Sequence, residues 1–247
     1  MAKLEWDSIG EHFYETGIDR GVLYPLIKGS CETGMAWNGI ANVSQNISGG
    51  EATSIYADNI KYLNIMSAEE LGLTIEAYDQ PDAFDECDGM VEITDGVNIC
   101  QQKRKHFGFS FRNKVGNDME DDEYGYKVHI VFDCVASPAD KSYQTINDTP
   151  EAIIKSWDVS TTPVSVGSGY KPVAEIILDA RLLRNAGLWN VLEALEDILY
   201  GTAATDPVMP SASEILTVYE QSMYLRDSSG SYILDSSGDK IQSSVFE

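Results

Sequence analysis

Hydrophobic and polar residues alternate with a period of two along much of the chain, and this pattern predicts β-strands. It is clearest in residues 71–78, 106–112, 126–134 and 173–182. In the first of these segments, Leu73 and Ile75 lie on one face of the strand, while Thr74 and Glu76 lie on the other. One apolar and one polar face are typical of half-buried antiparallel strands. We therefore expect a mainly β fold of the α+β class.

Two segments have the helical period instead. In residues 187–201, leucines and other apolar residues recur every three or four positions, and Gly201 provides a stop. Acidic residues such as Glu193 occupy the opposite face. A second, weaker helix is expected to begin near Ser211, because Glu214 follows it at the spacing of a capping box.

Turn-rich segments separate the strands. The sequence SQNISGGEATS, residues 44–54, lies between two strand-like segments, so we predict a protruding hairpin loop there. The acidic sequence GNDMEDDEYG, residues 116–125, is predicted to be a solvated hairpin tip. Its carboxylates have part of the spacing of a calcium loop, but Glu123 stands where that loop requires glycine.

The chain is predicted to divide into a main domain, residues 1–201, and an appendage, residues 202–247. The appendage begins with a linker and a short helix. It ends in a repeat, in which YLRDSSGS (224–231) is followed by YILDSSGD (232–239). Each DSSG favours a turn, so the repeat, which extends to residue 242, is expected to form a small β-meander. So few strands need a neighbour to pack on.

Charge and cysteine content narrow the function classes. The 247 residues include 40 acidic and 17 basic ones, which gives a net charge of −23. Affinity for nucleic acids or anionic membranes comes from Lys and Arg, so such a surface repels both. The four cysteines form no Cys-x-x-Cys pair. The N-terminal sequence MAKLEWDSIG lacks the apolar core of a signal peptide, so we expect synthesis in a cytoplasm, with reduced thiols.

One short segment concentrates carboxylates and is the first candidate for chemistry. It reads TIEAYDQPDAFDECDG, and its acidic residues after Glu76 are Asp79, Asp82, Asp85, Glu86 and Asp88. No register of this segment supplies the ligands of a calcium loop. We interpret it as a short helical turn with Phe84 and Cys87 facing the core. A cation site and an acid–base pair of carboxylates are the alternatives.

The remaining polar residues form no catalytic motif. The three histidines, His12, His106 and His129, match no metal-binding pattern, and His129 is predicted to lie at the surface beside Lys127. The basic run 103–105 is expected to pair with a neighbouring copy's acids or to protect a sheet edge. We therefore predict no catalytic residue, metal or cofactor, and a structural or binding protein rather than an enzyme.

Longer strings in the chain resemble one protein family. They include ETGIDRGVLYP, GMAWNGI, GGEATSIYADNIKYLNIMSAEELGLTIEAYDQPDAFDECDG, QKRKHFGFSFRNKVGND, YKVHIVFDCVASPADKSYQTIND and SWDVSTTPV. These strings, in this order and together with the helix that ends in LEDILYG, resemble the major tail protein, or tail tube protein, of long-tailed phages that infect Gram-positive bacteria. The resemblance extends from about residue 5 to residue 201, so the role of the appendage is left open.

The resemblance implies a tail-tube fold with β-sandwich-like, barrel-forming sheets and one flanking helix. Six copies would form a ring, and stacked rings would form a virion tail tube through which DNA passes into the host without specific binding. The implied partners are further copies, a tape-measure protein, and distal tail and terminator proteins. The family has no catalytic residues to transfer.

Within this framework, Thr74 and Glu76 are the candidates to face the channel. The candidates for contacts between subunits are residues of the predicted loop: Gln45, Asn46, Ile47, Ser48, Gly49, Gly50 and Glu51. Two other functions are weighed against the tail tube. One is a β-sandwich binding or adhesion module on a surface, and the other is a hydrolase with paired carboxylates.

Overall fold

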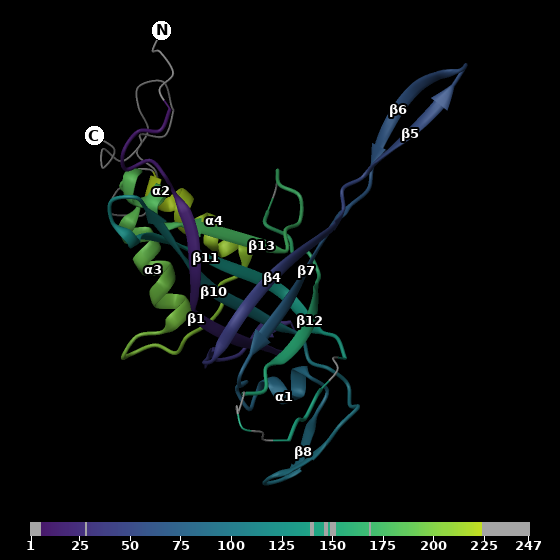
Figure 1. Ribbon diagram of the computed structural model, residues 1–247, viewed down its shortest axis with the longest axis vertical. Coiled ribbons are helices and arrows are strands. Elements are labelled where there is room, and N and C mark those ends of the chain that lie inside the picture. The colour runs from purple at the N-terminus through teal and green to yellow at the C-terminus, as the bar shows by residue number, and fades with distance from the viewer. Residues whose placement is uncertain are drawn as a thin grey trace.

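The protein is built around one large antiparallel sheet with helices on one face and a protruding hairpin (Figure 1). The computed structural model describes residues 6–27, 29–138, 141–145, 148, 152–167 and 169–223, without the side chains of residues 220–223. The strands of the large sheet are β1 (Tyr14–Ile27), β2 (Ser30–Cys31), β3 (Met35–Trp37), β4 (Ile40–Gly49), β7 (Glu69–Ala77), β10 (Phe107–Asn117), β11 (Asp121–Ala136), β12 (Lys155–Thr161) and β13 (Glu175–Asp179). This architecture confirms the prediction of a mainly β fold.

Two hairpins and four helices complete the described part of the chain. The hairpins pair β5 (Ala52–Ala57) with β6 (Ile60–Met66), and β8 (Val91–Thr94) with β9 (Val97–Ile99). The helices are α1 (Phe84–Cys87), α2 (Ala180–Asn185), α3 (Trp189–Tyr200) and α4 (Ala212–Met223). In the part of the chain that the structure describes, none of these helices is long and apolar enough to span a membrane.

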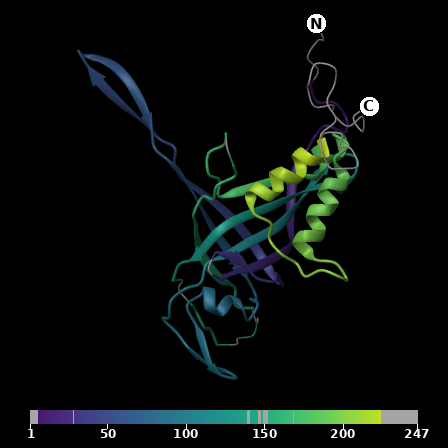
Figure 2. The same ribbon diagram turned by 180° about the vertical axis from the view of Figure 1, so that it is seen from behind.

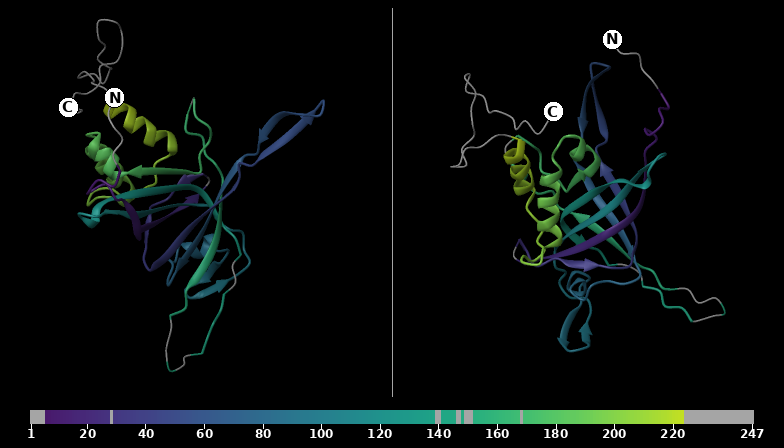
Figure 3. Two further views of the ribbon diagram at one scale, coloured as in Figure 1. Left: turned by 45° about the horizontal axis from the view of Figure 1, so that its top comes forward. Right: turned by 90° about the vertical axis from the view of Figure 1, so that its left-hand side faces the viewer.

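The large sheet curls because its longest strand, β11, pairs with different neighbours along different parts of its length. The strand order is β2-β1-β10-β11-β12-β7-β4, and β13 also pairs with β11. Residues 127–131 of β11 pair with β13, whereas residues 134–136 pair with β12. At the far edge, Ile40 at the start of β4 lies over Gly21 of β1, where a Cβ atom would be 2.2 Å from Ile40 Cδ1. The sheet therefore bends back toward its own first strand, as Figure 3 shows.

Hydrophobic cores fill both sides of this sheet. On the helical side, α3 and α4 pack on β1, β11 and β13, and Figure 2 shows these two helices in front of the sheet. On the concave side, an aromatic cluster joins α1 to the strands. The Phe84 ring lies 4.6 Å from the Trp37 ring and 5.1 Å from the Trp157 ring, measured between centroids. The sheet is thus buried on both faces where β10 and β11 cross its centre.

The helix predictions are confirmed. Helix α3 lies within residues 187–201 and buries Val191, Leu192, Leu195 and Leu199. At the start of α4, the Ser211 amide donates to Glu214 Oε2 at 2.8 Å, and the Glu214 amide donates to Ser211 Oγ at 3.3 Å. This is the predicted capping box. The short turn α1 also forms, with Phe84 and Cys87 buried.

Three local predictions were wrong. The strand expected over 173–182 ends at Asp179, whose carboxylate accepts a hydrogen bond from the Leu182 amide at 3.1 Å and so begins α2. The segment 44–54 is mostly strand, because β4 continues to Gly49 along β7. His129 is 8% exposed rather than at the surface, since its ring stacks on Phe111.

The segment after residue 201 contributes to the main core. Met209, Ala212 and Ile215 are buried among the residues of α3 and the sheet. The Pro207 carbonyl also accepts a hydrogen bond from the Gly34 amide at 2.7 Å. The division of the chain at residue 201 stays a prediction, and the repeat at 224–242 lies outside the described residues.

A buried hydroxyl ties the first strand to α3, and its removal should lower stability. Tyr24 Oη donates to the Leu199 carbonyl at 2.7 Å and lies 3.3 Å from Ser110 Oγ. This carbonyl belongs to the last turn of α3, where the helix offers no amide. We expect Tyr24→Phe to lower the free energy of unfolding in urea by about 1–2 kcal/mol, because a buried acceptor is left unpaired.

The matched control is Tyr170→Phe, which removes the same atom from a side chain that is 70% exposed. It should change stability by less than about 0.5 kcal/mol. Equal stability of the two variants would refute the role assigned to the Tyr24 hydroxyl.

Candidate assembly surfaces

A continuous polar surface covers the outer side of β4, β7 and β12. The strand register places Thr74 between Ser44 and Asp158, and Glu76 between Asn42 and Ser156. Alternation puts the core residues Leu73 and Ile75 on the other side of β7. We call this surface the polar face, and it consists of Asn42, Ser44, Asn46, Thr74, Glu76, Ser156, Asp158 and Ser160.

Hydrogen bonds between side chains fix the polar face across its strands. Asn42 Nδ2 donates to Glu76 Oε2 at 3.2 Å, and Asn46 Nδ2 donates to Thr74 Oγ1 at 3.3 Å. Thr74 Oγ1 in turn donates to Asp158 Oδ1 at 2.9 Å. The charged members of this set are Glu76 and Asp158, so the polar face carries negative charge and no Lys or Arg. The structure thus places both channel candidates, Thr74 and Glu76, on one ordered surface, and their exposure to a channel stays a prediction.

The hairpin of β5 and β6 projects far from the rest of the protein, at the upper right of Figure 1. We call residues 51–67 the arm. At its base, the Ser67 amide donates to the Glu51 carbonyl at 3.1 Å. At its tip, Asp58 and Asn59 have φ values of 50° and 63°, as a type I′ turn requires.

Two glycines separate the arm from the sheet. Gly49 and Gly50 have φ values of 79° and 70°, and a Cβ atom on Gly49 would lie 2.0 Å from the Ala68 carbonyl oxygen. Only glycine fits this conformation and this close approach, so the chain can leave β4 in a new direction. The predicted contact residues, 45–51, therefore lie in the end of β4 and at the base of the arm rather than in a loop.

The arm exposes many apolar side chains. Its residues of this kind that are more than a third exposed are Ile55, Tyr56, Ile60, Tyr62, Leu63, Ile65 and Met66. Strand alternation and register place Ile55, Ile60, Leu63 and Ile65 on the same face. Lys61 is the one cation of the arm. The sequence contained a signal that we missed, since Asp58-Asn59 between two runs of strand-forming residues is typical of a hairpin.

The carboxylate cluster at residues 79–88 is largely neutralised within the chain. Asp88 is buried, with Oδ1 3.3 Å from Arg104 Nη1 and Oδ2 2.7 Å from Lys141 Nζ. Glu86 forms an ion pair with Lys105. Arg104 and Lys105 of the basic run 103–105 thus pair with acids of their own chain rather than with those of a neighbouring copy, and protection of a sheet edge stays a prediction. Among the described residues, no group of three or more His, Cys, Asp or Glu side chains is placed to hold a metal ion.

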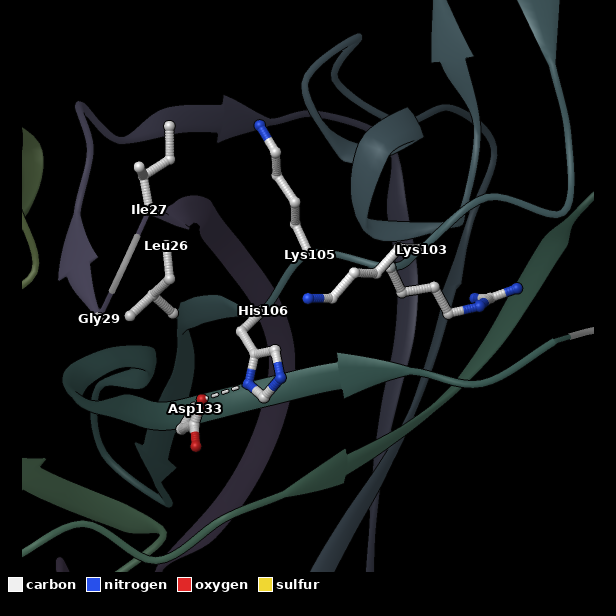
Figure 4. Close-up of a pocket in the computed structure, with 8 residues that line it drawn as sticks. Leu26, Ile27, Gly29, Lys103, Lys105, His106 and Asp133 are labelled. Atoms are coloured by element: carbon white, nitrogen blue, oxygen red, sulfur yellow. Dashed lines mark hydrogen bonds and ion pairs between the residues drawn. The ribbon is translucent and has the colours of Figure 1, made fainter.

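A hollow of about 640 Å³ lies beside the basic run, and Figure 4 shows its lining. His106 Nδ1 lies 2.6 Å from Asp133 Oδ1. The residues that line the hollow include no Ser, Thr or Cys, so the described lining offers His106 no side-chain hydroxyl or thiol to activate. Lys103 makes no ion pair with another described side chain.

The acidic turn after β10 is a hairpin tip, as predicted, and it also holds the N-terminal segment. Asp118 Oδ1 accepts a hydrogen bond from the Gly10 amide at 3.0 Å, and Asp118 Oδ2 lies 3.2 Å from His12 Nδ1. The Gly10 bond, assisted by His12, lowers the pKa of Asp118 to about 2. This carboxylate is thus engaged within the chain rather than free to bind a cation.

Comparisons with known proteins give distant structural neighbours. No family model and no curated protein matches the chain. A chain of the anti-feeding prophage baseplate is similar with a TM-score of 0.34 and 8% identity, over 71% of this chain and 97% of that chain. A chain of an extracellular contractile injection system, in its extended sheath–tube complex, is similar with a TM-score of 0.29 and 10% identity, over 65% and 88%. At these TM-scores neither similarity carries an argument about this chain.

Proposed function

We propose that this protein is a structural subunit of a phage tail tube, in which rings of copies stack around a channel for DNA. One observation carries the proposal: the strands that present the polar face, β4 and β7, continue directly into an exposed apolar arm. A hydrophilic surface and an apolar arm are therefore built from the same continuous pair of chain segments. This combination suits a subunit that contacts other copies while it lines an aqueous channel.

The arm supports the assembly part of this proposal. An isolated two-stranded hairpin is marginally stable in water, and exposed apolar side chains on a strand invite association. On a chain with a net charge of −23, the arm is also a region with many exposed apolar side chains and few charges. The arm therefore promotes contact between copies whose high net charge otherwise keeps them apart.

The polar face supports the channel part of the proposal. Double-stranded DNA carries one negative charge per roughly 1.7 Å of its axis, and each Lys or Arg on a channel wall would add an attractive contact. The polar face offers hydroxyls, amides and the two carboxylates of Glu76 and Asp158 instead. DNA would thus slide past it without being held.

The resemblance in sequence completes the proposal. It indicates rings of six copies, a location in the virion of a phage of Gram-positive bacteria, and partners that are the tape-measure, distal tail and terminator proteins. The role is structural, with no catalytic step and no cofactor.

Negative-stain microscopy at increasing ionic strength tests the proposal. We expect monomers in low salt and rings or tubes in higher salt. Each copy carries a net charge of −23, and its repulsion is screened as the Debye length falls from about 30 Å at 0.01 M to about 8 Å at 0.15 M. Light scattering during a salt titration gives the assembly rate. Tubes that form fastest at the lowest ionic strength would contradict this account of the charge, and discrete monomers under all conditions would favour a binding or adhesion module.

A further inference from the structure

We infer that the apolar face of the arm docks on the β8–β9 hairpin of a second copy, head to tail. The inference rests on the proposed function, in which copies polymerise, and it names the surface that receives the arm. It begins from an apolar exposure that the fold of a single copy does not explain.

The β8–β9 hairpin is the second place where a small sheet exposes apolar side chains. It pairs Val91 with Ile99, and Val91, Ile93, Val97 and Ile99 are 37%, 65%, 50% and 40% exposed. On the arm, Ile55, Ile60, Leu63 and Ile65 are 39%, 65%, 40% and 54% exposed. The two surfaces are therefore matched, each with four aliphatic side chains. Burying one against the other removes both from water.

The two hairpins carry opposite charges that can meet at the edge of the contact. The β8–β9 hairpin carries Glu92 and Asp95 and no cation between residues 91 and 99. The arm carries Lys61, which forms no ion pair within the described chain. Lys61 pairs with Tyr56 and so lies behind the apolar face, where it can approach these acids only at the edge of the contact. The aliphatic surfaces rather than charge therefore stabilise the docking.

The positions of the two hairpins make the contact heterologous. In Figure 1, with the longest axis vertical, the arm projects upward and the β8–β9 hairpin downward. In that view the arm also lies to the right of the hairpin, so two copies in the same orientation, one above the other and displaced sideways, bring the arm of the lower copy to the hairpin of the upper one. The pair then retains one free hairpin, on the lower copy, and one free arm, on the upper copy, so the contact propagates as a tube requires.

Because the arm and the β8–β9 hairpin project in opposite directions, we can also predict which of their parts meet. When the hairpins overlap, the tip of the arm lies beside the base of the β8–β9 hairpin. Cys100 follows β9 at that base and is exposed, whereas Cys87 and Cys134 are buried and Cys31 is half-buried. Burial raises the pKa of these other three thiols and so reduces their reactivity. Cys100 is therefore a native reporter of the contact.

Cross-linking of assembled protein tests the inference. Ala57→Cys places a thiol near the tip of the arm, on its apolar face. A short bismaleimide should then link it to Cys100 of the next copy and give a ladder of trimers and larger species in denaturing gels. Thr53→Cys lies on the same face but about 13 Å nearer the base of the arm, at about 3.3 Å per residue, and should give little product. Circular dichroism checks that each variant is folded.

The outcomes separate this inference from the proposed function. Adding Cys100→Ser to the Ala57→Cys variant should abolish the ladder. Cross-linking that persists without Cys100 and stops at dimers would mean that arms dock on arms. Normal tubes without cross-linking to Cys100 would overturn the docking site and leave the tail-tube proposal standing. If the wild-type protein forms no tubes under any condition, the proposed function fails, and the docking site fails with it.

Discussion

Replacement of residues 52–66 by an Asn-Gly turn is expected to give a stable, folded monomer that forms no tubes. None of the replaced residues belongs to either core, so the free energy of unfolding should change by no more than about 1 kcal/mol. The remaining ends are already paired, because the Ser67 amide donates to the Glu51 carbonyl, and a two-residue turn closes such a pair. Assembly should be lost completely, since the exposed aliphatic residues that would be buried between copies are removed. Circular dichroism measures the fold, and negative-stain microscopy counts the tubes.

The matched control introduces the same dipeptide and keeps the arm. Replacing Asp58 and Asn59 with Asn-Gly retains the type I′ turn, so tubes should form normally. The chosen boundaries matter, because deletion of residues 46–53 would also remove residues of β4 that pair with β7 and would damage the sheet itself. Normal tubes from the shortened protein would refute the role of the arm.

Alternation in the sequence correctly predicted which way strand residues point where one side of the sheet is apolar and the other is polar. Leu73 and Ile75 are buried and Thr74 and Glu76 are on the polar face, as the pattern of β7 indicated. The same reasoning failed for residues 45–49, where polar side chains and a glycine resemble a loop. Their extended conformation comes from pairing with β7, and tertiary context of this kind overrides local preference.

The arm was harder to predict because it exposes apolar residues on both of its faces. Periodicity detects an element through the contrast between a buried and a solvated side, and the arm has no buried side in one copy. A surface that becomes buried only in an assembly thus resembles a short core strand. The Asp58-Asn59 turn was the remaining local signal.

Long-range partners explain the polar residues that sequence reasoning misplaced. His129 is buried because Glu175 lies 2.7 Å from its Nδ1 atom and Asn113 lies 3.0 Å from its Nε2 atom. Asp88 is buried because two cations neutralise it. These partners are distant in sequence, and the strand register brings them together. Register likewise adds the residues of β4 and β12 to the polar face, for which the sequence alone had indicated only Thr74 and Glu76.

Substitution of Glu76 by lysine is expected to permit tube assembly and to slow DNA ejection, most strongly in low salt. The new ammonium group would lie on a polar face that otherwise carries no cation, beside Asn42 and Ser156. Each copy gains two units of positive charge, and the symmetry of rings and stacks repeats this change along the whole proposed channel. A contact between lysine and phosphate weakens as salt rises, because binding releases counterions from DNA. Measuring ejection from variant phages at two ionic strengths therefore gives both the delay and its electrostatic origin.

A control for charge alone is Glu193→Lys, which makes the same change at an exposed position of α3, on the helical side of the sheet. It should leave ejection at the wild-type rate in both salts. Glu76→Lys should lower the free energy of unfolding only slightly, since the substitution removes one exposed hydrogen bond, from Asn42 to the carboxylate. A stable Glu76→Lys tube that ejects DNA at the wild-type rate in low salt would show that β7 does not line the channel. The acidity of the chain would then serve to keep copies apart, and the polar face would be an outer surface of the tube.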